Sequence, residues 1–286
     1  MKVVLDFFKY QGCGNDFVVI DETAAHQTQD RVRGILATKL CDRHLGIGAD
    51  GIIFVEPADG CDGSMRLFEP AGNEADMCGN GLRCVAAFLF TASEKDEFTI
   101  LTRDGVRKVV KTDDEYRVDM GPVRSLRSDL RQYVRDEGLP TDSMMDFPLY
   151  NDASSQKACM LNTGEPHIVA FTDDISSMNV AEIGASLNAD RDRFPLGVNI
   201  NFVQVTGPGE ITIRTYERGV YGETMACGTG ATACAAASLF TGRTESRTVD
   251  VITRGGILRI EVARDGHAFM TGPAIMAFAG HIEVDI

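Results

Sequence analysis

Two short cysteine motifs are the residues of this chain whose types and spacing could do chemistry as a pair. Cys78-Gly79-Asn80-Gly81 recurs 149 residues later as Cys227-Gly228-Thr229-Gly230, and each motif begins a run of small and apolar residues that favours a helix. Unpaired N–H groups at a helix N-terminus favour negative charge, so a cysteine placed there ionises more readily than a free one. The adjacent glycine lets a substrate approach the backbone, and the same turn can hold a carboxylate through its amides.

Such a pair of motifs predicts proton transfer at a carbon atom. If two helices of this kind face each other across a cleft, their thiols flank one ligand from opposite sides. One thiolate removes a proton from a tetrahedral carbon, the opposite thiol delivers a proton to the other face, and the stereocentre is inverted. The amides of both helix ends would stabilise the enolate-like carboxylate formed between the steps. A lone cysteine is more often a small buried hydrophobe, but the duplication favours the catalytic interpretation.

The segments that must position these cysteines are also repeated. Gly14-Asn15-Asp16-Phe17-Val18-Val19 is echoed 150 residues later by Gly164-Glu165-Pro166-His167-Ile168-Val169. Arg66-Leu67-Phe68-Glu69 is echoed 148 residues later by Arg214-Thr215-Tyr216-Glu217. Three matches in the same order predict two similar domains made by duplication, with coincidence among glycine-rich turns as the alternative. We expect the following division: 1–119 together with 274–286, then 120–273, with the polar stretch 120–144 as the junction.

Hydrophobic periodicity predicts the individual elements. Buried strands are expected at 17–20 and 52–55, and a helix between them that Gly46 would end. The apolar stripe of that helix is formed by Val32, Ile35, Leu36 and Leu40. A second helix is expected at 81–90 with its N-terminus near Cys78. Strands are expected in three further segments: antiparallel ones in 98–120 and 247–264, and one in 275–286 that crosses back to the first domain.

Composition bounds the class of protein. The chain has 286 residues, of which 44% are hydrophobic and 24% charged, and a mean hydropathy of −0.08, which excludes disordered, collagen-like and multi-span membrane proteins. The net charge of −14 repels phosphate, so nucleic acid and anionic membranes are poor partners. No apolar stretch is long enough to span a membrane, and the start of the chain breaks at Asp6 before a signal-peptide core. We expect a cytoplasmic protein whose eight cysteines, with no Cys-x-x-Cys pair, are mostly reduced thiols.

At these motifs the sequence resembles the diaminopimelate epimerase family of cofactor-independent amino-acid racemases and epimerases. The resemblance spans nearly the whole chain and is carried by these segments: 12–17, 48–51, 77–84, 164–167, 198–199, 217–219 and 222–230. It implies an α/β (α+β) fold of two pseudo-symmetric domains, each a mixed or antiparallel sheet wrapped around a central helix. It also implies an amino-acid substrate, no pyridoxal phosphate or other cofactor, no metal, and compatibility with a homodimer.

The resemblance further implies roles for single residues. Cys78 and Cys227 would be the catalytic acid–base pair. Backbone contacts to the reacting carboxylate would come from Gly79, Asn80, Gly228 and Thr229. The substrate cleft would be lined by Asn15, Asn199, Glu217 and Arg218. His167 and Glu217 would orient the α-amino group and the thiols, although a purely structural, hydrogen-bonded role for His167 fits equally well.

Three departures from the family pattern concern the substrate. Glu69 begins Glu-Pro-Ala-Gly-Asn where the family has Asn-Ala-Asp-Gly-Ser, Glu165 replaces the asparagine of Gly-Asn-Pro-His, and Tyr221 is a one-residue insertion. In the family both asparagines help to hold the far, carboxylate-bearing end of diaminopimelate. Two carboxylates repel by about 4 kcal/mol at about 4 Å and an effective dielectric of about 20. We therefore expect a basic amino acid as substrate: lysine, ornithine, arginine or histidine. The alternative is that one or both glutamates are protonated, turn away or pair with Arg218. The reaction would then be the LL- to meso-diaminopimelate epimerisation of lysine and peptidoglycan biosynthesis.

Other signals favour different functions less well. Gly46-Ile47-Gly48-Ala49-Asp50-Gly51 matches a dinucleotide fingerprint in form, but it follows a predicted helix and precedes a strand, the reverse of the required order. No His-x-x-x-His pair or calcium-loop spacing indicates a metal site. A thiol redox protein and a non-catalytic amino-acid-binding module remain as alternatives from other functional classes.

Overall fold

The protein folds into two compact units. The computed structural model describes residues 2–24, 28–91, 93–135, 145, 147–149 and 157–285. One unit comprises Met1–Asp119 with Thr271–Ile286, and the other comprises Met120–Met270. Of the polar stretch expected as the junction, residues 136–144 lie outside the described part of the chain.

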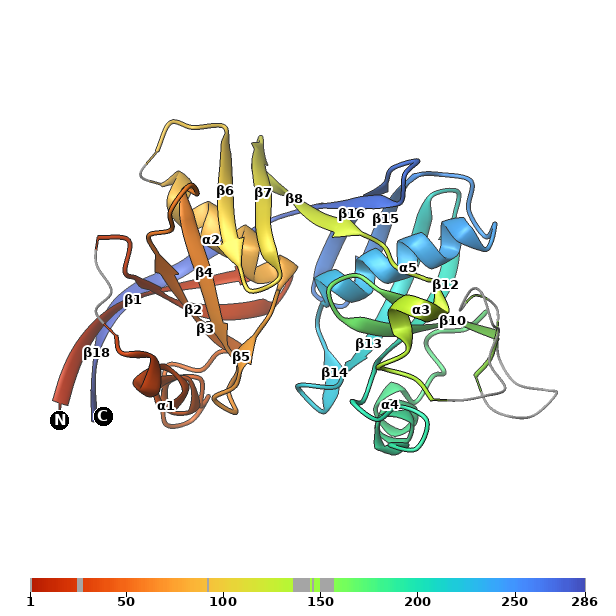
Figure 1. The fold of residues 1–286 in the computed structure, drawn as a ribbon, viewed down its shortest axis with the longest axis horizontal. Coiled ribbons are helices and arrows are strands. Elements are labelled where there is room, and N and C mark those ends of the chain that lie inside the picture. The colour runs from red at the N-terminus through yellow and green to blue at the C-terminus, as the bar shows by residue number, and fades with distance from the viewer. Residues whose placement is uncertain are drawn as a thin grey trace. The chain divides into compact units, whose positions relative to one another are not determined.

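The first unit is a mixed sheet (Figure 1). Its strands follow one another by pairing as β18 (Ile275–Asp285), β1 (Lys2–Gly12), β2 (Asn15–Asp21), β3 (Gly51–Glu56), β4 (Gly63–Phe68), β6 (Glu97–Thr102), β7 (Gly105–Thr112) and β8 (Glu115–Pro122). The pairs β2–β3 and β4–β6 are parallel, and the other pairs are antiparallel. A two-residue strand, β5 (Glu74–Ala75), pairs with β4 just before the first cysteine motif.

The second unit repeats this arrangement. Its strands pair in the order β9 (Phe147–Pro148), β10 (Lys157–Asn162), β11 (Pro166–Phe171), β12 (Asn199–Gly207), β13 (Glu210–Glu217), β15 (Thr248–Thr253) and β16 (Gly256–Val262). The parallel pairs are again those between the third and fourth and between the fifth and sixth strands of this order, β11–β12 and β13–β15. A short strand, β14 (Gly222–Thr224), pairs with β13 as β5 does with β4, and β17 (His267–Gly272) completes the strands.

Each unit has one helix inside its sheet and one outside. In the first unit α2 (Gly79–Phe90) packs against β1, β2, β3, β4 and β7, while α1 (Asp30–Leu40) packs against β3 and β4 (Figure 1). In the second unit α5 (Gly228–Phe240) packs against β10 to β13, β15 and β16, and α4 (Val180–Ala189) packs against β12, β13 and β14. A one-turn helix, α3 (Arg127–Leu130), contacts β10. Among the residues that the structure describes, no helix is both long and apolar enough to cross a membrane.

The repeat extends to single ion pairs. Arg66 on β4 makes a two-point pair with Glu74 on β5, with N···O distances of 2.7 and 3.0 Å. Arg214 on β13 makes the same pair with Glu223 on β14, at 2.7 and 2.9 Å. Each pair links the strand before a cysteine motif to the short strand that leads into it. The duplication predicted from the sequence is therefore confirmed in the strand pairing and in its side chains.

Alternation along the strands decides which side chains face the inner helix. Val18, Ile20, Ile52 and Phe54 join one core cluster with Leu36 of α1. The intervening Ile53 lies under α2, because a Cβ built on Gly81 would lie 3.2 Å from its Cδ1. In the second unit the residues on the α4 side include Ile168, Ile200 and Phe202. Period-two alternation therefore turns His167, Asn199 and Asn201 towards α5.

The first helix differs from its prediction in two ways. It ends at Leu40, not at Gly46, and Ile35 of the predicted stripe is 48% exposed. The buried position is taken by Arg33, which is 1% exposed and pairs with the carboxylates of Glu22 and Glu56. Gly46 belongs to the loop that folds back on the helix end, where a Cβ would lie 2.3 Å from the Lys39 carbonyl oxygen. The glycine therefore marks a close approach of two backbones, which a stripe of apolar residues cannot predict.

Candidate active site

Cys78 is the N-cap residue of α2. Its backbone is extended, with φ −147° and ψ 114°, and the first intrahelical bond runs from Leu82 N to Cys78 O at 2.9 Å. The Gly81 amide points at the Cys78 Sγ, 3.4 Å away. The amides of Gly79 and Asn80 precede that first helical bond, in the positions where a helix end holds an anion.

Asn15 orients the groups around Cys78. Its Nδ2 donates to Asp50 Oδ2 at 2.8 Å, so its Oδ1 faces the opposite way. That oxygen accepts a hydrogen bond from Asn80 Nδ2 at 3.0 Å and lies 3.9 Å from Cys78 Sγ. Three predicted site residues of the first unit are thus brought together, with a carbonyl oxygen facing the thiol.

Arg83, one turn further along α2, is a buried cation near this cysteine. It is 0% exposed and its Nε donates to the Pro273 carbonyl at 3.1 Å. Burial lowers the pKa of Arg83, and the charges of Cys13, Cys84 and Cys78, in falling order, raise it. Burial raises the pKa of the Cys84 thiol to about 12, so Cys84 stays protonated. Arg83 lies within the segment 77–84 that carries the family resemblance, but no role was predicted for it from the sequence.

Glu69, the other predicted binding residue of the first unit, follows β4 in a tight turn. Its amide donates to the Asn73 carbonyl and its own carbonyl accepts from the Gly72 amide, both at 2.8 Å. The residue is half-buried.

Cys227 occupies the equivalent position in the second unit. It is the N-cap of α5, with φ −121° and ψ 114°, and the first helical bond runs from Ala231 N to Cys227 O at 2.8 Å. The amides of Gly228 and Thr229 precede that bond. The thiol is more deeply placed than that of Cys78: Cys227 is 6% exposed, and its Sγ lies 3.4 Å from Thr229 Oγ1.

His167 contacts this cysteine motif through Thr229. Its Nε2 lies 2.9 Å from Thr229 Oγ1, and its Nδ1 lies 3.1 Å from Asn201 Nδ2. Burial, with a smaller effect from the Arg218 charge, lowers the pKa of His167 to about 3, so the imidazole is neutral at ordinary pH. Asn201 escaped the sequence interpretation. The available signal was a second asparagine two residues after Asn199, in the stretch Asn199–Val203 whose other residues are apolar.

Asn199 connects two of the predicted binding segments. Its Nδ2 donates to the Pro166 carbonyl at 3.2 Å, and its Oδ1 accepts from the Arg218 amide at 2.9 Å. The Arg218 guanidinium in turn makes an ion pair with Glu165, and each side chain is about a quarter exposed. Glu165 therefore faces a cation that the chain itself supplies.

Glu217 ends β13, and the inserted Tyr221 lies in the turn that follows. Glu217 Oε1 accepts a hydrogen bond from Thr224 Oγ1 at 2.5 Å. The Tyr221 amide donates to the Glu217 carbonyl at 2.8 Å, and Tyr221 adopts a positive φ of 55° with its side chain 69% exposed. The insertion is thus absorbed by a turn whose side chain points to solvent.

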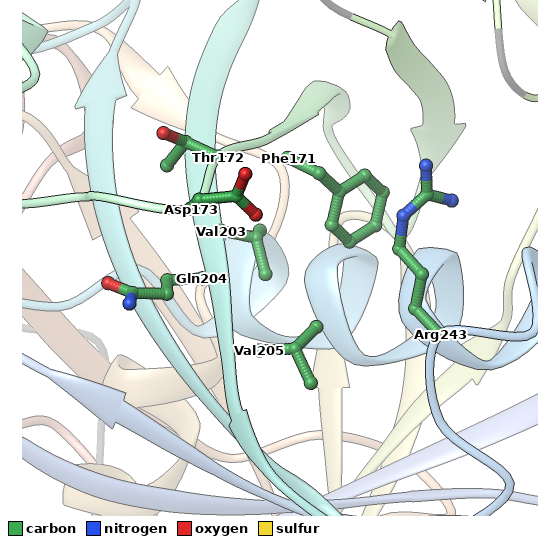
Figure 2. A pocket seen from close by; sticks show the side chains of 7 residues that line it. All are labelled: Phe171, Thr172, Asp173, Val203, Gln204, Val205 and Arg243. Atoms are coloured by element: carbon green, nitrogen blue, oxygen red, sulfur yellow. The ribbon is translucent and has the colours of Figure 1, made fainter.

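A surface hollow of about 420 Å³ lies elsewhere on the second unit (Figure 2). It is lined by Phe171, Thr172, Asp173, Val203, Gln204, Val205 and Arg243. The Arg243 guanidinium lies over the Phe171 ring, 4.0 Å from its centre. Figure 2 shows the two side chains next to each other. None of the predicted site residues lines this hollow. Among the described residues there is no cluster of three or more histidine, cysteine or acidic side chains that could hold a metal ion.

Comparison with known proteins places the chain in a family. A family model described as diaminopimelate epimerase matches residues 7–126 and 159–277. The diaminopimelate epimerase of Synechocystis sp. is 38% identical over 288 residues, covering 99% of this chain and 100% of that protein. The diaminopimelate epimerase of Methanocella arvoryzae is 35% identical, covering 98% of each.

Solved structures share the fold at lower identity. A PhzF-family phenazine biosynthesis protein from Enterococcus faecalis has a TM-score of 0.67 and 16% identity, covering 99% of this chain and 100% of that one. A hydroxyproline epimerase from Agrobacterium vitis has a TM-score of 0.63 and 14% identity, covering 99% and 92%. At these identities the likeness concerns the fold alone. The family model and the full-length relatives carry the assignment: the chain belongs to the diaminopimelate epimerase family and is an isomerase of that cofactor-independent type.

Proposed function

We propose that this protein epimerises diaminopimelate at an α-carbon, with Cys78 and Cys227 as the acid–base pair. The observation that carries the proposal is the duplicated placement of the two thiols. Each is the N-cap of the inner helix of its unit, with glycine next in the chain and backbone amides ahead of the first helical bond. Relatives that are at least 35% identical along their whole length are named diaminopimelate epimerase.

The reaction needs no electron transfer. One cysteine enters as thiolate and takes the α-proton, which leaves the electron pair on the substrate as an enolate-like carboxylate. The other enters as thiol and gives its proton to the opposite face of the carbon. The amides of Gly79, Asn80, Gly228 and Thr229 would carry the carboxylate charge while it is largest. The protonation states of the two thiols are exchanged after each turnover and are reset by proton exchange with water.

The expectation of a basic amino acid as substrate rested on two carboxylates, those of Glu69 and Glu165. The Glu165–Arg218 ion pair weakens that expectation at Glu165, because the negative charge there is already matched by a guanidinium. The curated relatives that carry the family assignment give no support to a basic substrate. Diaminopimelate, the alternative considered from the sequence, is therefore the substrate that we propose.

The test is turnover in deuterium oxide. Enzyme is incubated separately with LL-diaminopimelate, lysine, ornithine, arginine and histidine, and products are resolved by chiral chromatography and weighed by mass spectrometry. We expect meso-diaminopimelate carrying one solvent deuterium at the inverted carbon and no inversion of the basic amino acids. Cys78→Ala and Cys227→Ala should each abolish inversion, whereas Cys61→Ala, a matched change at a partly exposed thiol in a surface turn, should not. Inversion of a basic amino acid in preference to diaminopimelate would overturn the substrate, and turnover by the double cysteine variant would overturn the mechanism.

A further inference from the structure

A chain of buried polar side chains leads across the second unit to Cys227. Thr215 Oγ1 lies 2.9 Å from Asn201 Oδ1, and Asn201 Nδ2 lies 3.1 Å from His167 Nδ1. His167 Nε2 lies 2.9 Å from Thr229 Oγ1, which lies 3.4 Å from Cys227 Sγ. No member of this chain is more than 6% exposed. Buried polar groups of this kind are held in fixed orientations by their hydrogen bonds.

The direction of every hydrogen bond in this chain follows from one contact of Asn201. Asn201 Nδ2 also donates to the Ile168 carbonyl at 2.9 Å, and a carbonyl can only accept, so the amide NH₂ group must face both Ile168 and His167. His167 Nδ1 is therefore an acceptor. The neutral imidazole then carries its proton on Nε2, which donates to the Thr229 hydroxyl oxygen.

The Thr229 hydroxyl hydrogen is left to point at Cys227. Since His167 Nε2 occupies the Thr229 oxygen as a donor, that hydroxyl cannot donate back to the ring. Within the described part of the chain, the other polar side-chain atom beside this hydroxyl is Cys227 Sγ, at 3.4 Å. A hydroxyl that donates to sulfur stabilises the thiolate over the thiol, because the charged form is the stronger acceptor.

We infer that Asn201 is a positioning residue: it fixes the Nε2–H tautomer of His167 and, through His167 and Thr229, delivers a hydrogen bond that stabilises the Cys227 thiolate. The inference rests on the proposed function, because a stabilised thiolate at Cys227 matters only if Cys227 exchanges protons with substrate. In this chain of hydrogen bonds Asn201 contacts His167, and His167 contacts Thr229. Asn201 therefore acts on the Cys227 thiol indirectly, through His167 and Thr229.

The first unit provides an internal comparison. By strand register, Phe17 occupies the position of His167, Ile53 that of Asn201 and Leu67 that of Thr215. Gly81 and Gly230 confirm the equivalence, since their built Cβ atoms would meet Ile53 and Asn201 respectively. Three apolar side chains thus stand where the second unit has its polar ones. The side chain beside Cys78 offers an acceptor, Asn15 Oδ1, in addition to the Gly81 amide donor, whereas the side chain beside Cys227 is the Thr229 hydroxyl, so the side-chain surroundings of the two thiols differ.

Arg218, which is paired with Glu165, is a charged group that acts on His167. Of the strands packed against α5, β11 brings His167 to its first turn, and β10 brings Cys159 close to Cys234 further along the helix. Within the described residues, a relay of neutral side chains through His167 and Thr229 therefore leads to Cys227.

The first test reads the tautomer in the unaltered protein. The side chains of the five histidines are labelled with ¹⁵N, and the His167 signal is assigned by its absence in His167→Asn. We expect Nε2–H with an unprotonated Nδ1 from pH 8 down to pH 5, a range in which an ordinary histidine titrates. An Nδ1–H tautomer, or protonation of His167 within that range, would overturn the inference without reference to any activity.

The second test reads the effect at sulfur. The rate of iodoacetamide alkylation is measured against pH for Cys78 and Cys227 together, by mass spectrometry of peptides from the same sample. In Asn201→Leu, which keeps the shape and removes the donor, the Cys227 rate at neutral pH should fall about tenfold, the loss of roughly one hydrogen bond to a charged group. The Cys78 rate should not change.

A matched control lies next along the chain of bonds. Thr215→Val removes the hydroxyl that Asn201 Oδ1 accepts but leaves both acceptors of the Asn201 NH₂ group, so the Cys227 rate should stay within about twofold of wild type. An unchanged Cys227 profile in folded Asn201→Leu, or equal shifts at both cysteines, would overturn the inference. If the tautomer and the alkylation profiles are as expected but no amino acid exchanges its α-proton, the proposed function fails while the relay stands.

Discussion

The Arg218 guanidinium donates to the carboxylate of Glu165, 53 residues away in the chain, at the point where the segment before β11 meets the turn after β13. Asn199 holds both segments together through the Arg218 amide and the Pro166 carbonyl. A substrate carboxylate that approaches Arg218 must therefore compete with a carboxylate already in place. The pair is about a quarter exposed, so the competition is moderated by water.

Neutralising Glu165 should strengthen the binding of diaminopimelate. In Glu165→Gln, Arg218 loses its internal counter-ion and becomes available to a substrate carboxylate. Because the pair is partly exposed, we expect KM to fall by a factor of about three to five with kcat nearly unchanged, and added salt to reduce the difference. Steady-state kinetics at low and high ionic strength measure this. An increase in KM would show that Glu165 binds the substrate directly.

The buried His167 should make the protein sensitive to acid. Its pKa is about 3 in the folded protein against 6.5 in the ordinary state, so the unfolded chain binds the extra proton between these values. Stability contributed by neutral His167 is complete above pH 6.5 and should be lost by about 1.4 kcal/mol for each pH unit as the pH falls towards 3. Urea unfolding of wild type and His167→Gln at pH 7.5, 6.0 and 5.0 measures the difference in slope. His281→Gln, at an exposed position on β18, should keep the wild-type slope.

Gly230 and Gly81 offer a matched pair for the packing of the inner helices. An alanine Cβ at Gly230 would lie 2.5 Å from Asn201 Oδ1, which is held by its own hydrogen bonds, whereas at Gly81 the contact is 3.2 Å to the mobile end of Ile53. Gly230→Ala should lower the free energy of unfolding by about 1–3 kcal/mol. Gly81→Ala should cost less than about 1 kcal/mol, because helix propensity offsets the crowding. Equal stability of the two variants in urea would contradict this account of the Asn201 position.

Arg83 should favour the thiolate at Cys78. It is fully buried and lies within Coulombic reach of Cys78, while the neighbouring Cys84 thiol is kept protonated by its own burial. In Arg83→Met the Cys78 alkylation rate at neutral pH should fall by about three- to tenfold, with recovery in Arg83→Lys and no change at Cys227. Circular dichroism verifies that the variants fold. An unchanged Cys78 rate in folded Arg83→Met would assign Arg83 to packing alone.

Much of the fold follows from local pattern. The strands at 17–20 and 52–55 were predicted because uninterrupted β-branched and aromatic residues suit a strand buried on both faces, and the structure buries all of them. The start of α2 at Cys78 was predicted because a Cys-Gly motif precedes a run of small apolar residues. The same argument applies to α5. These features depend on residues that are close in sequence, so they could be predicted from this one sequence.

The missed features depend on contacts between distant segments. Nothing near Glu165 in the sequence indicates that its partner is Arg218, and the expectation of a basic substrate treated Glu165 as a carboxylate without this partner. Arg33 is buried on α1 in place of Ile35 because it forms ion pairs with Glu22 and Glu56, which lie in other segments. Asn201 became visible as a site residue only once β11 and β12 were paired and His167 lay beside it. Side-chain partners of this kind are decided by register and alternation across strands.

The pairing of β18 with β1 has a consequence for biosynthesis. Ten register pairs join them, from Lys2 with Asp285 to Gln11 with Ile275, and Val284 shares a core cluster with Leu5 and Phe7. During translation the whole of the second unit leaves the ribosome before β18 does. Until β18 is synthesised, the edge of β1 that pairs with it has no partner strand. The unit that is synthesised first is therefore the last to complete its sheet.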